Sequence, residues 1–114
     1  MTASLQITLR NISHSGALDA CIRERADQLD KFYPNIISLQ VVVEIPHKHH
    51  RQGNLFNVRL EIKVPGEVIV LTRDLREDVY VALRDVFDTA SRKLVDYGRR
   101  QRGAFKAHDI SLKR

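Results

Sequence analysis

The sequence of 114 residues contains one cysteine, no tryptophan and no long apolar run. A single cysteine cannot form a disulfide within the chain, and Cys21 falls among the apolar positions of a predicted helix, so we interpret it as a small core side chain. No apolar stretch approaches the roughly 20 residues that span a bilayer. The N-terminus lacks the basic-then-apolar pattern of a signal peptide. These absences predict a soluble, unexported protein of the cytoplasm.

Signatures of catalysis are also missing from the sequence. It has no glycine-rich phosphate loop, no Cys-x-x-Cys pair and no nucleophile in a recognisable setting. The best metal-binding candidate is the run with His47, His49 and His50, but no second paired motif accompanies it. A solvated loop that becomes more positive at mildly acidic pH is the favoured interpretation. We therefore expect no enzymatic activity, no metal, no cofactor and no small-molecule substrate.

Positive charge is concentrated at the C-terminal end. The chain has 19 Lys and Arg against 14 Asp and Glu, a formal net charge of +5. From Arg92 onward only Asp96 and Asp109 oppose a basic group made up of Arg92, Lys93, Arg99, Arg100, Arg102, Lys106, Lys113 and Arg114. A concentrated positive field favours a polyanion, with nucleic acid as the first candidate and an acidic membrane surface as the second.

Hydrophobic periodicity predicts six elements. Apolar and polar residues alternate with period two over residues 5–10, 37–45 and 56–64, which predicts three strands, and the apolar segment 67–72 returns after the Pro65-Gly66 turn as a fourth. Apolar residues recur every three or four positions between Ser15, a plausible N-cap, and Tyr33, which precedes Pro34, and the stripe includes Leu18, Ile22, Leu29 and Phe32. The same spacing runs from Val79 to Tyr97 and predicts a second helix, beyond which Gly98 makes helix less certain.

The order of these elements predicts an α+β fold, β-α-β-β-β-α. The first two strands are joined through a helix and can lie parallel, whereas Pro65-Gly66 joins the last two as a tight turn, so strands two to four form an antiparallel meander. Because each helix has one apolar stripe, we expect a two-layer sandwich with both helices on one face of a four-stranded mixed sheet. Residues 1–102 form one domain, and residues 103–114 are expected to be a flexible basic tail or the start of a linker to a further domain.

The predicted second helix carries basic side chains on every side of its core stripe. On a helical wheel Arg92 and Arg99 lie opposite the stripe, Lys93 and Arg100 lie on one flank, and Arg84 and Arg102 lie on the other. Such a surface would make salt-dependent phosphate contacts with little sequence preference. Asp85, Asp88 and Asp96 on the same helix support a merely solvated face instead, and the charge pattern alone leaves both interpretations open.

Arg25 occupies an unusual place in the first predicted helix, near the centre of its apolar stripe. A guanidinium there has to emerge beside the second helix or pair within the interface. Either the charge is presented in the groove between the helices, toward RNA, or Arg25 is a structural arginine whose stem covers the core. The sequence leaves these two interpretations equally open.

Several segments together resemble one protein family. They are Leu5-Gln-Ile-Thr8, the helix ending Asp27-Gln-Leu-Asp-Lys-Phe-Tyr33, the strand Val41-Val-Val-Glu44, the segment from Asp78 to Asp88, and Ala90-Ser-Arg-Lys-Leu94. In order and spacing they are similar to the ribosome hibernation promoting factor and ribosome-associated inhibitor family, also called the sigma-54 modulation family. The resemblance covers residues 4–102.

This resemblance implies a double-stranded-RNA-binding-like fold that docks in the small ribosomal subunit, in the cleft between head and body. There a family member covers the paths of messenger and transfer RNA and silences ribosomes under stress, without a cofactor. The residues that match the family's RNA-facing positions are Arg25, Arg84, Arg92, Lys93, Arg99 and Arg100. We expect the isolated domain to be monomeric and the ribosome, through its RNA, to be its partner.

Three features depart from the family pattern: the acidic residues of the second helix, the His- and Lys-rich segment at residues 47–53, and the tail at residues 103–114. The alternative function is a protein-interaction module that modulates a transcription factor. Whether the protein pairs ribosomes or keeps them single is left open by the sequence.

Overall fold

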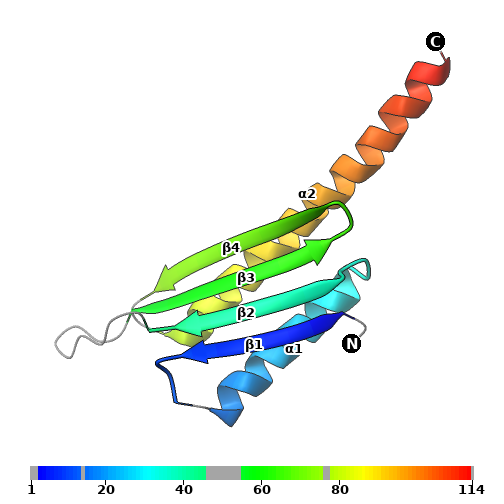
Figure 1. Cartoon of the computed structure of the whole chain (residues 1–114). Helices are drawn as coiled ribbons and strands as arrows, with labels where there is room; N and C mark the ends of the chain where they lie inside the picture. The colour runs from blue at the N-terminus through cyan, green and yellow to red at the C-terminus, as the bar shows by residue number, and fades with distance from the viewer. Residues whose placement is uncertain (1–2, 14, 46–54, 76–77, 114) are drawn as a thin grey trace.

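The computed structural model describes residues 3–13, 15–45, 55–75 and 78–113, with the side chains of residue 75 and of residues 103–113 outside the described part. The elements follow the predicted order (Figure 1): β1 (Ser4–Arg10), α1 (Gly16–Phe32), β2 (Ser38–Glu44), β3 (Phe56–Val64), β4 (Glu67–Leu75) and α2 (Val79–Lys113). The predicted segment with His47, His49 and His50 lies outside the described residues. Within the described ranges, no three His, Cys, Asp or Glu side chains gather to hold a metal ion, and no helix is long and apolar enough to cross a membrane.

The four strands form one mixed sheet in the order β1-β2-β3-β4. β1 pairs with β2 in parallel, and β2–β3 and β3–β4 are antiparallel. Gly66 has a φ of +89°, a left-handed conformation that glycine adopts without steric cost in a tight turn between two strands. The predicted α+β sandwich with a mixed sheet is confirmed.

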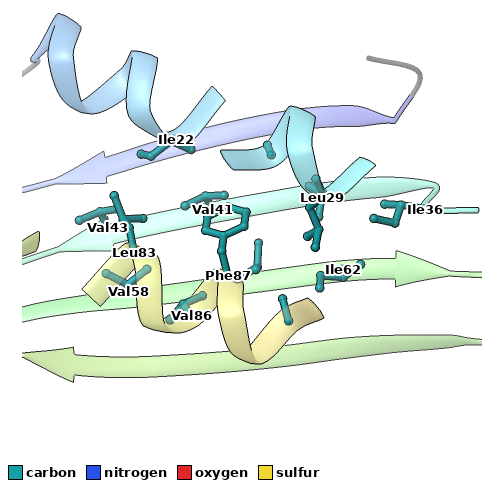
Figure 2. Packing of buried hydrophobic residues seen from close by; sticks show 14 of the residues in the cluster. Ile22, Leu29, Ile36, Val41, Val43, Val58, Ile62, Leu83, Val86 and Phe87 are labelled. Carbon is teal, nitrogen blue, oxygen red and sulfur yellow. The ribbon is translucent and has the colours of Figure 1, made fainter. Parts of the chain in front are cut away.

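The register gives the sheet a buried face and an open face. Val41 lies opposite Ile7 on one side and Leu60 on the other, so alternate residues of three strands point toward the helices. The central strands bury this face completely (Figure 2), with Leu39, Val41, Val43, Val58, Leu60 and Ile62 at most 1% exposed. On the other face the same strands carry Gln40, Glu61 and Lys63. Both helices therefore cover one face (Figure 1), as predicted.

The first helix begins and ends where local chemistry predicts. The Ser15 hydroxyl accepts a hydrogen bond from the Leu18 amide at 3.2 Å, as an N-cap does, and Asp19 lies in the first turn. Tyr33 adopts an extended backbone conformation ahead of Pro34 and ends the helix. Leu18, Ile22 and Leu29 are buried, and Cys21 is partly buried against the same core.

The second helix is anchored to the rest of the molecule at Tyr97. Its hydroxyl donates to the carbonyl oxygen of Pro65 in the β3–β4 turn. Its ring meets that of Tyr33 edge-on, with centroids 6.0 Å apart and planes at 72°. The end of α1, the β3–β4 turn and α2 therefore converge at one end of the sheet.

The helical backbone of α2 continues past Tyr97 to Lys113, farther than the apolar pattern alone predicts. Gly98 does not interrupt it: this glycine is buried beside the Tyr33 ring, and an added Cβ would lie in ordinary contact with that ring, 3.6 Å from its Cε2 atom. The following residues include strong helix formers such as Arg, Gln, Lys and Ala. In Figure 1 this extension projects beyond the sheet. That residues 103–114 form a flexible tail or the start of a linker in solution stays a prediction.

Candidate nucleic-acid interface

The net positive charge of the helix layer comes from α2, because α1 has no excess of basic residues. Over its described side chains α2 has three acidic residues, Asp85, Asp88 and Asp96, against six basic ones, whereas α1 carries four acidic residues against three basic ones. The excess gathers in the last described turns, where Asp96 alone opposes a group that we call the basic end: Arg92, Lys93, Arg99, Arg100 and Arg102. This group lies beside the convergence of α1, α2 and the β3–β4 turn.

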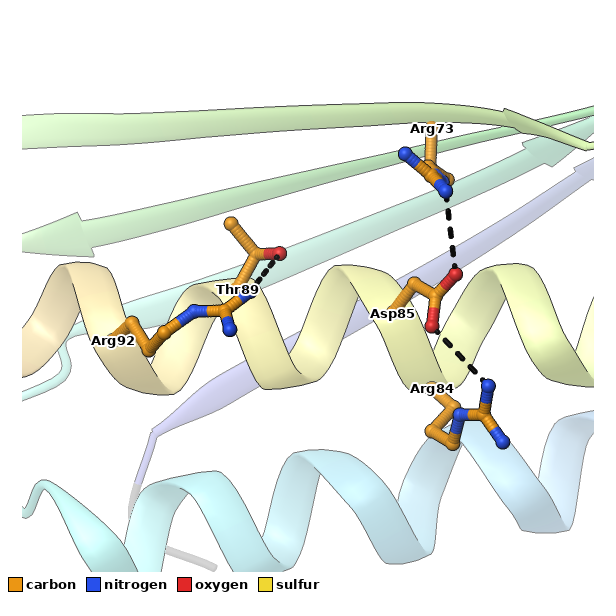
Figure 3. Close-up of polar contacts among 5 residues, drawn as sticks. All are labelled: Arg73, Arg84, Asp85, Thr89 and Arg92. Atoms are coloured by element: carbon orange, nitrogen blue, oxygen red, sulfur yellow. Dashed lines mark hydrogen bonds and ion pairs between the residues drawn. The ribbon is translucent and has the colours of Figure 1, made fainter.

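Two of the predicted residues point away from the protein body. Arg92 and Arg99 are seven residues apart, so they share one face of α2, and both are exposed. Arg92 Nη2 donates to the Thr89 hydroxyl at 3.2 Å (Figure 3), which orders its guanidinium along the helix surface. Arg99 has no hydrogen bond or ion pair within the described part of the chain. Both guanidinium groups are thus available to a ligand.

Lys93 and Arg100 form a second pair with the same spacing, on the flank of α2 that faces β4. The position of this flank follows from Arg100, whose Nη2 lies 3.2 Å from Glu67 Oε1 at the start of β4. The Arg100 side chain keeps 64% of its exposure, so the ion pair directs the guanidinium without hiding it. An exposed pair of this kind adds little stability, and Arg100 retains donors for other acceptors.

Arg25 and Arg84 lie on the opposite flank, toward α1. A groove of about 210 Å³ separates the helices and is lined by Arg25, Gln28, Leu29, Phe32, Phe87, Asp88 and Ser91. Arg84 is one turn before Asp88 on the same face of α2. Arg25 is half-buried along the groove and forms no ion pair or hydrogen bond with any described residue, which fits both a charge presented in the groove and a structural arginine whose stem covers the core. Its role in RNA binding stays a prediction.

One of the three acidic residues on α2 is neutralised within the protein. Asp85 lies 3.5 Å from the guanidinium of Arg73 on β4 and 3.5 Å from that of Arg84, one carboxylate oxygen facing each (Figure 3). Asp88 and Asp96 are exposed without such a partner among the described residues. The charge of Asp85 is therefore offset in part by Arg73, a cation from outside α2.

Phe32 is a component of this surface that the sequence pattern assigned wrongly. The periodicity placed it in the core stripe of the first helix, but its side chain is 54% exposed at the edge of the groove. At this end of α1 it is the next residue, Tyr33, that packs inward, with its ring edge-on against that of Tyr97. The adjacent aromatic pair was the one signal in the sequence that pointed to an outward ring.

The Tyr97 side chain is buried at this junction in its neutral, protonated form. Burial raises the pKa of Tyr97 above its ordinary value of 10.0, and the nearby Tyr33 and Glu67 raise it further, while Arg100 partly offsets them by lowering it. The hydroxyl therefore keeps the proton that it donates to Pro65 at every physiological pH. The contacts of Tyr97 with Pro65 and Tyr33 therefore fix the part of α2 that carries the basic end.

Comparisons with known proteins identify the same architecture. A model of the family described as sigma 54 modulation protein / S30EA ribosomal protein matches residues 5–102, which include four complete elements (α1, β2, β3 and β4), β1 from Leu5 onward and α2 as far as Arg102. A structure of a ribosomal subunit interface protein from Coxiella burnetii is similar with a TM-score of 0.71 and 17% identity, covering 83% of this chain and 97% of that one. The N-terminal domain of Protein Y from Thermus thermophilus gives a TM-score of 0.67 and 16% identity, covering 85% of this chain and 99% of that one. The search of curated proteins gives no match.

Proposed function

The chain belongs to the sigma 54 modulation protein / S30EA ribosomal protein family, and from this premise we propose that it is a ribosome-associated factor that silences translation. In this proposal it binds the small subunit through ribosomal RNA in the cleft between head and body, in the bacterial cytoplasm. Bound there as a monomeric domain, it excludes messenger and transfer RNA. The observation that carries the proposal is the basic end of α2, on a chain whose residues 5–102 match this family.

The distribution of charge favours the helix layer as the surface that meets RNA. On the open face of the sheet the basic residues Arg10 and Arg59 lie within 3.7 Å and 3.5 Å of Glu44 and Glu61, so that face is close to balanced. The basic end, in contrast, has one internal ion pair, Arg100–Glu67, among its described residues. Phosphate groups gain most from cations that are not already paired.

The proposed mechanism is occlusion and needs no chemical step. Messenger and transfer RNA present the same phosphate chemistry as the walls of the cleft that they occupy, and a folded domain seated there takes their space. Binding should therefore be competitive with both ligands and should weaken steeply as salt increases, because each phosphate contact releases condensed counterions. The affinity should depend little on base sequence for the contacts made by the basic end.

The test combines sedimentation and translation. Purified protein is mixed with small subunits, and its recovery in the pellet is measured with increasing salt, then with added transfer RNA and a short messenger. The proposal expects salt-sensitive recovery, displacement by the two ligands, and inhibition of cell-free translation at the same protein concentration that saturates the subunits. Recovery only in the ribosome-free fraction at low salt contradicts it, and capture of a transcription factor without ribosomal RNA favours the alternative function.

A further inference from the structure

The groove between the helices differs in chemistry from the basic end. Its floor is apolar, formed by Leu29 and Phe87, which are 3% and 4% exposed. One wall carries the exposed ring of Phe32, and the rim carries Arg25 and Gln28 from α1. Asp88 and Ser91 approach from α2. An exposed aromatic ring beside one cation and several hydrogen-bonding groups suits a planar ligand better than a bare phosphate.

We propose that this groove binds a single unstacked guanine base of single-stranded RNA. The inference rests on the proposed function and deepens it, since it names a base-reading contact at a surface otherwise expected to contact only phosphates. In the proposed arrangement the base stacks on the Phe32 ring, Arg25 binds the adjacent phosphate, and the Asp88 carboxylate accepts hydrogen bonds from the edge of the base.

The two charged groups of the groove have no partner among the described residues. Neither Arg25 nor Asp88 makes an ion pair or hydrogen bond with any residue in the described ranges, although both line the same groove of about 210 Å³. Ser91 donates its hydroxyl proton to the Phe87 carbonyl oxygen at 3.2 Å, so its oxygen remains as an acceptor. The α2 side of the groove therefore offers acceptors, from Asp88 and Ser91, and the α1 side offers the donors of Arg25.

Acceptors on that side select among the bases. A carboxylate only accepts hydrogen bonds, and it does so best from two parallel donors. Guanine presents two adjacent donors, N1–H and the N2 amino group, on its pairing edge. Adenine and cytosine each set an acceptor beside their amino group, and uracil sets carbonyl oxygens on both sides of its one donor. Asp88, which repels phosphate, thus fits the edge of guanine.

The first experiment uses short RNA alone and so does not depend on the ribosome. The isotope-labelled protein is titrated with UUGUU, UUAUU, UUCUU and UUIUU, in which inosine lacks the N2 amino group, and amide shifts of the groove residues are followed by NMR. We expect shifts at Phe32, Asp88 and Ser91 that saturate first with UUGUU, with UUIUU weaker. Asp88→Asn should abolish the preference for guanine. Equal shifts for the four RNAs, or shifts confined to the basic end, overturn the inference.

The second experiment measures affinity for small subunits. Stacking on an aromatic side chain contributes roughly 5- to 150-fold per base by alanine substitution, so Phe32→Ala should lose at least about fivefold in affinity without changing the salt dependence. Phe32→Trp should retain affinity. Tyr80→Ala is the matched control, because Tyr80 is also an exposed aromatic, at 41%, but does not line the groove.

The two experiments separate the inference from the proposed function. Wild-type protein that fails to bind small subunits contradicts the proposed function, and the RNA titration still decides the guanine site. Wild-type binding with no loss in Phe32→Ala, at an unchanged melting temperature, overturns the guanine site and leaves the proposed function in place. Loss of affinity in Tyr80→Ala equal to that in Phe32→Ala also counts against the groove.

Discussion

Removing the two outward arginines of α2 gives the clearest test of the proposed RNA-binding surface. The variant carries Arg92→Gln and Arg99→Gln, which removes two positive charges that no acidic residue within the described part of the chain neutralises. Arg92 loses one exposed hydrogen bond to Thr89, of 3.2 Å, and Arg99 loses none in the described part. Exposed substitutions of this kind usually change stability by less than about 0.5 kcal/mol, so the fold should be unaffected.

The expected magnitude follows from counterion release. Each phosphate contact contributes about 0.7 to 0.9 to the slope of log affinity against log salt concentration. Two lost contacts therefore reduce the slope by roughly 1.6. Over a fourfold increase in salt, such as from about 50 to 200 mM, the wild type should then lose about tenfold more affinity than the variant.

The assay is binding to purified small subunits across that salt range, with the melting temperature of each protein measured in parallel. Arg59→Gln with Lys63→Gln is the matched control, because it removes the same charge from the open face of the sheet. We expect the control to keep the wild-type slope. An unchanged slope in the Arg92/Arg99 variant, or an equal change in the control, would refute the assignment of RNA binding to α2.

The remaining predictions concern the fold that supports this surface. Leu83→Ala empties a fully buried site and should lower stability by about 2–5 kcal/mol, measured by urea unfolding; a cost below 1 kcal/mol would mean that α2 is not packed as described. Ser15→Ala removes the N-cap and should lower the free energy of unfolding by about 1 kcal/mol in the same assay. Ser15→Asp should keep most of the wild-type stability, because aspartate is also a good N-cap. Tyr97→Phe tests the raised pKa of Tyr97: the unfolded phenol ionises first, so the stability contributed by neutral Tyr97 is complete below pH 10.0 and is lost as pH rises above it. The wild type should therefore exceed Tyr97→Phe in stability below pH 10.0 and lose that advantage progressively as the pH rises above 10.0, whereas a gap that stays constant would show that Tyr97 ionises alike in both states.

The sequence predicted the fold well because the fold rests on local patterns. Alternation along β3 gave its bounds, Phe56–Val64, and the parallel and antiparallel pairings followed from the connections. The N-cap at Ser15 is likewise a short-range interaction, visible in sequence. The end of β4 was harder: it was predicted at Thr72 but the strand reaches Leu75. Arg73 lies there on the side of the helix layer, where its guanidinium pairs with the carboxylate of Asp85 on α2. An ion pair between such distant segments has no local signature in the sequence.

The candidate RNA-binding surface was only partly predictable, because several of its contacts join segments that are distant in the chain. Wheel positions placed Arg92 and Arg99 outward, but the ion pairs of Asp85 and of Arg100 depend on β4 and needed the tertiary structure. Phe32 fitted the apolar period and still lies outside, because the choice between Phe32 and Tyr33 depends on Tyr97, 64 positions after Tyr33 in the chain. Hydrophobic periodicity predicts the buried face of a single helix, whereas the groove is lined by residues of both α1 and α2 and depends on how the two helices pack.

A density map of the protein bound to small ribosomal subunits tests the central claim most directly. We predict density for this domain in the cleft between head and body, with the basic end of α2 against ribosomal RNA and the open face of the sheet turned away from it. Density at another site, or in the cleft with the open face of the sheet against the RNA, would contradict the account.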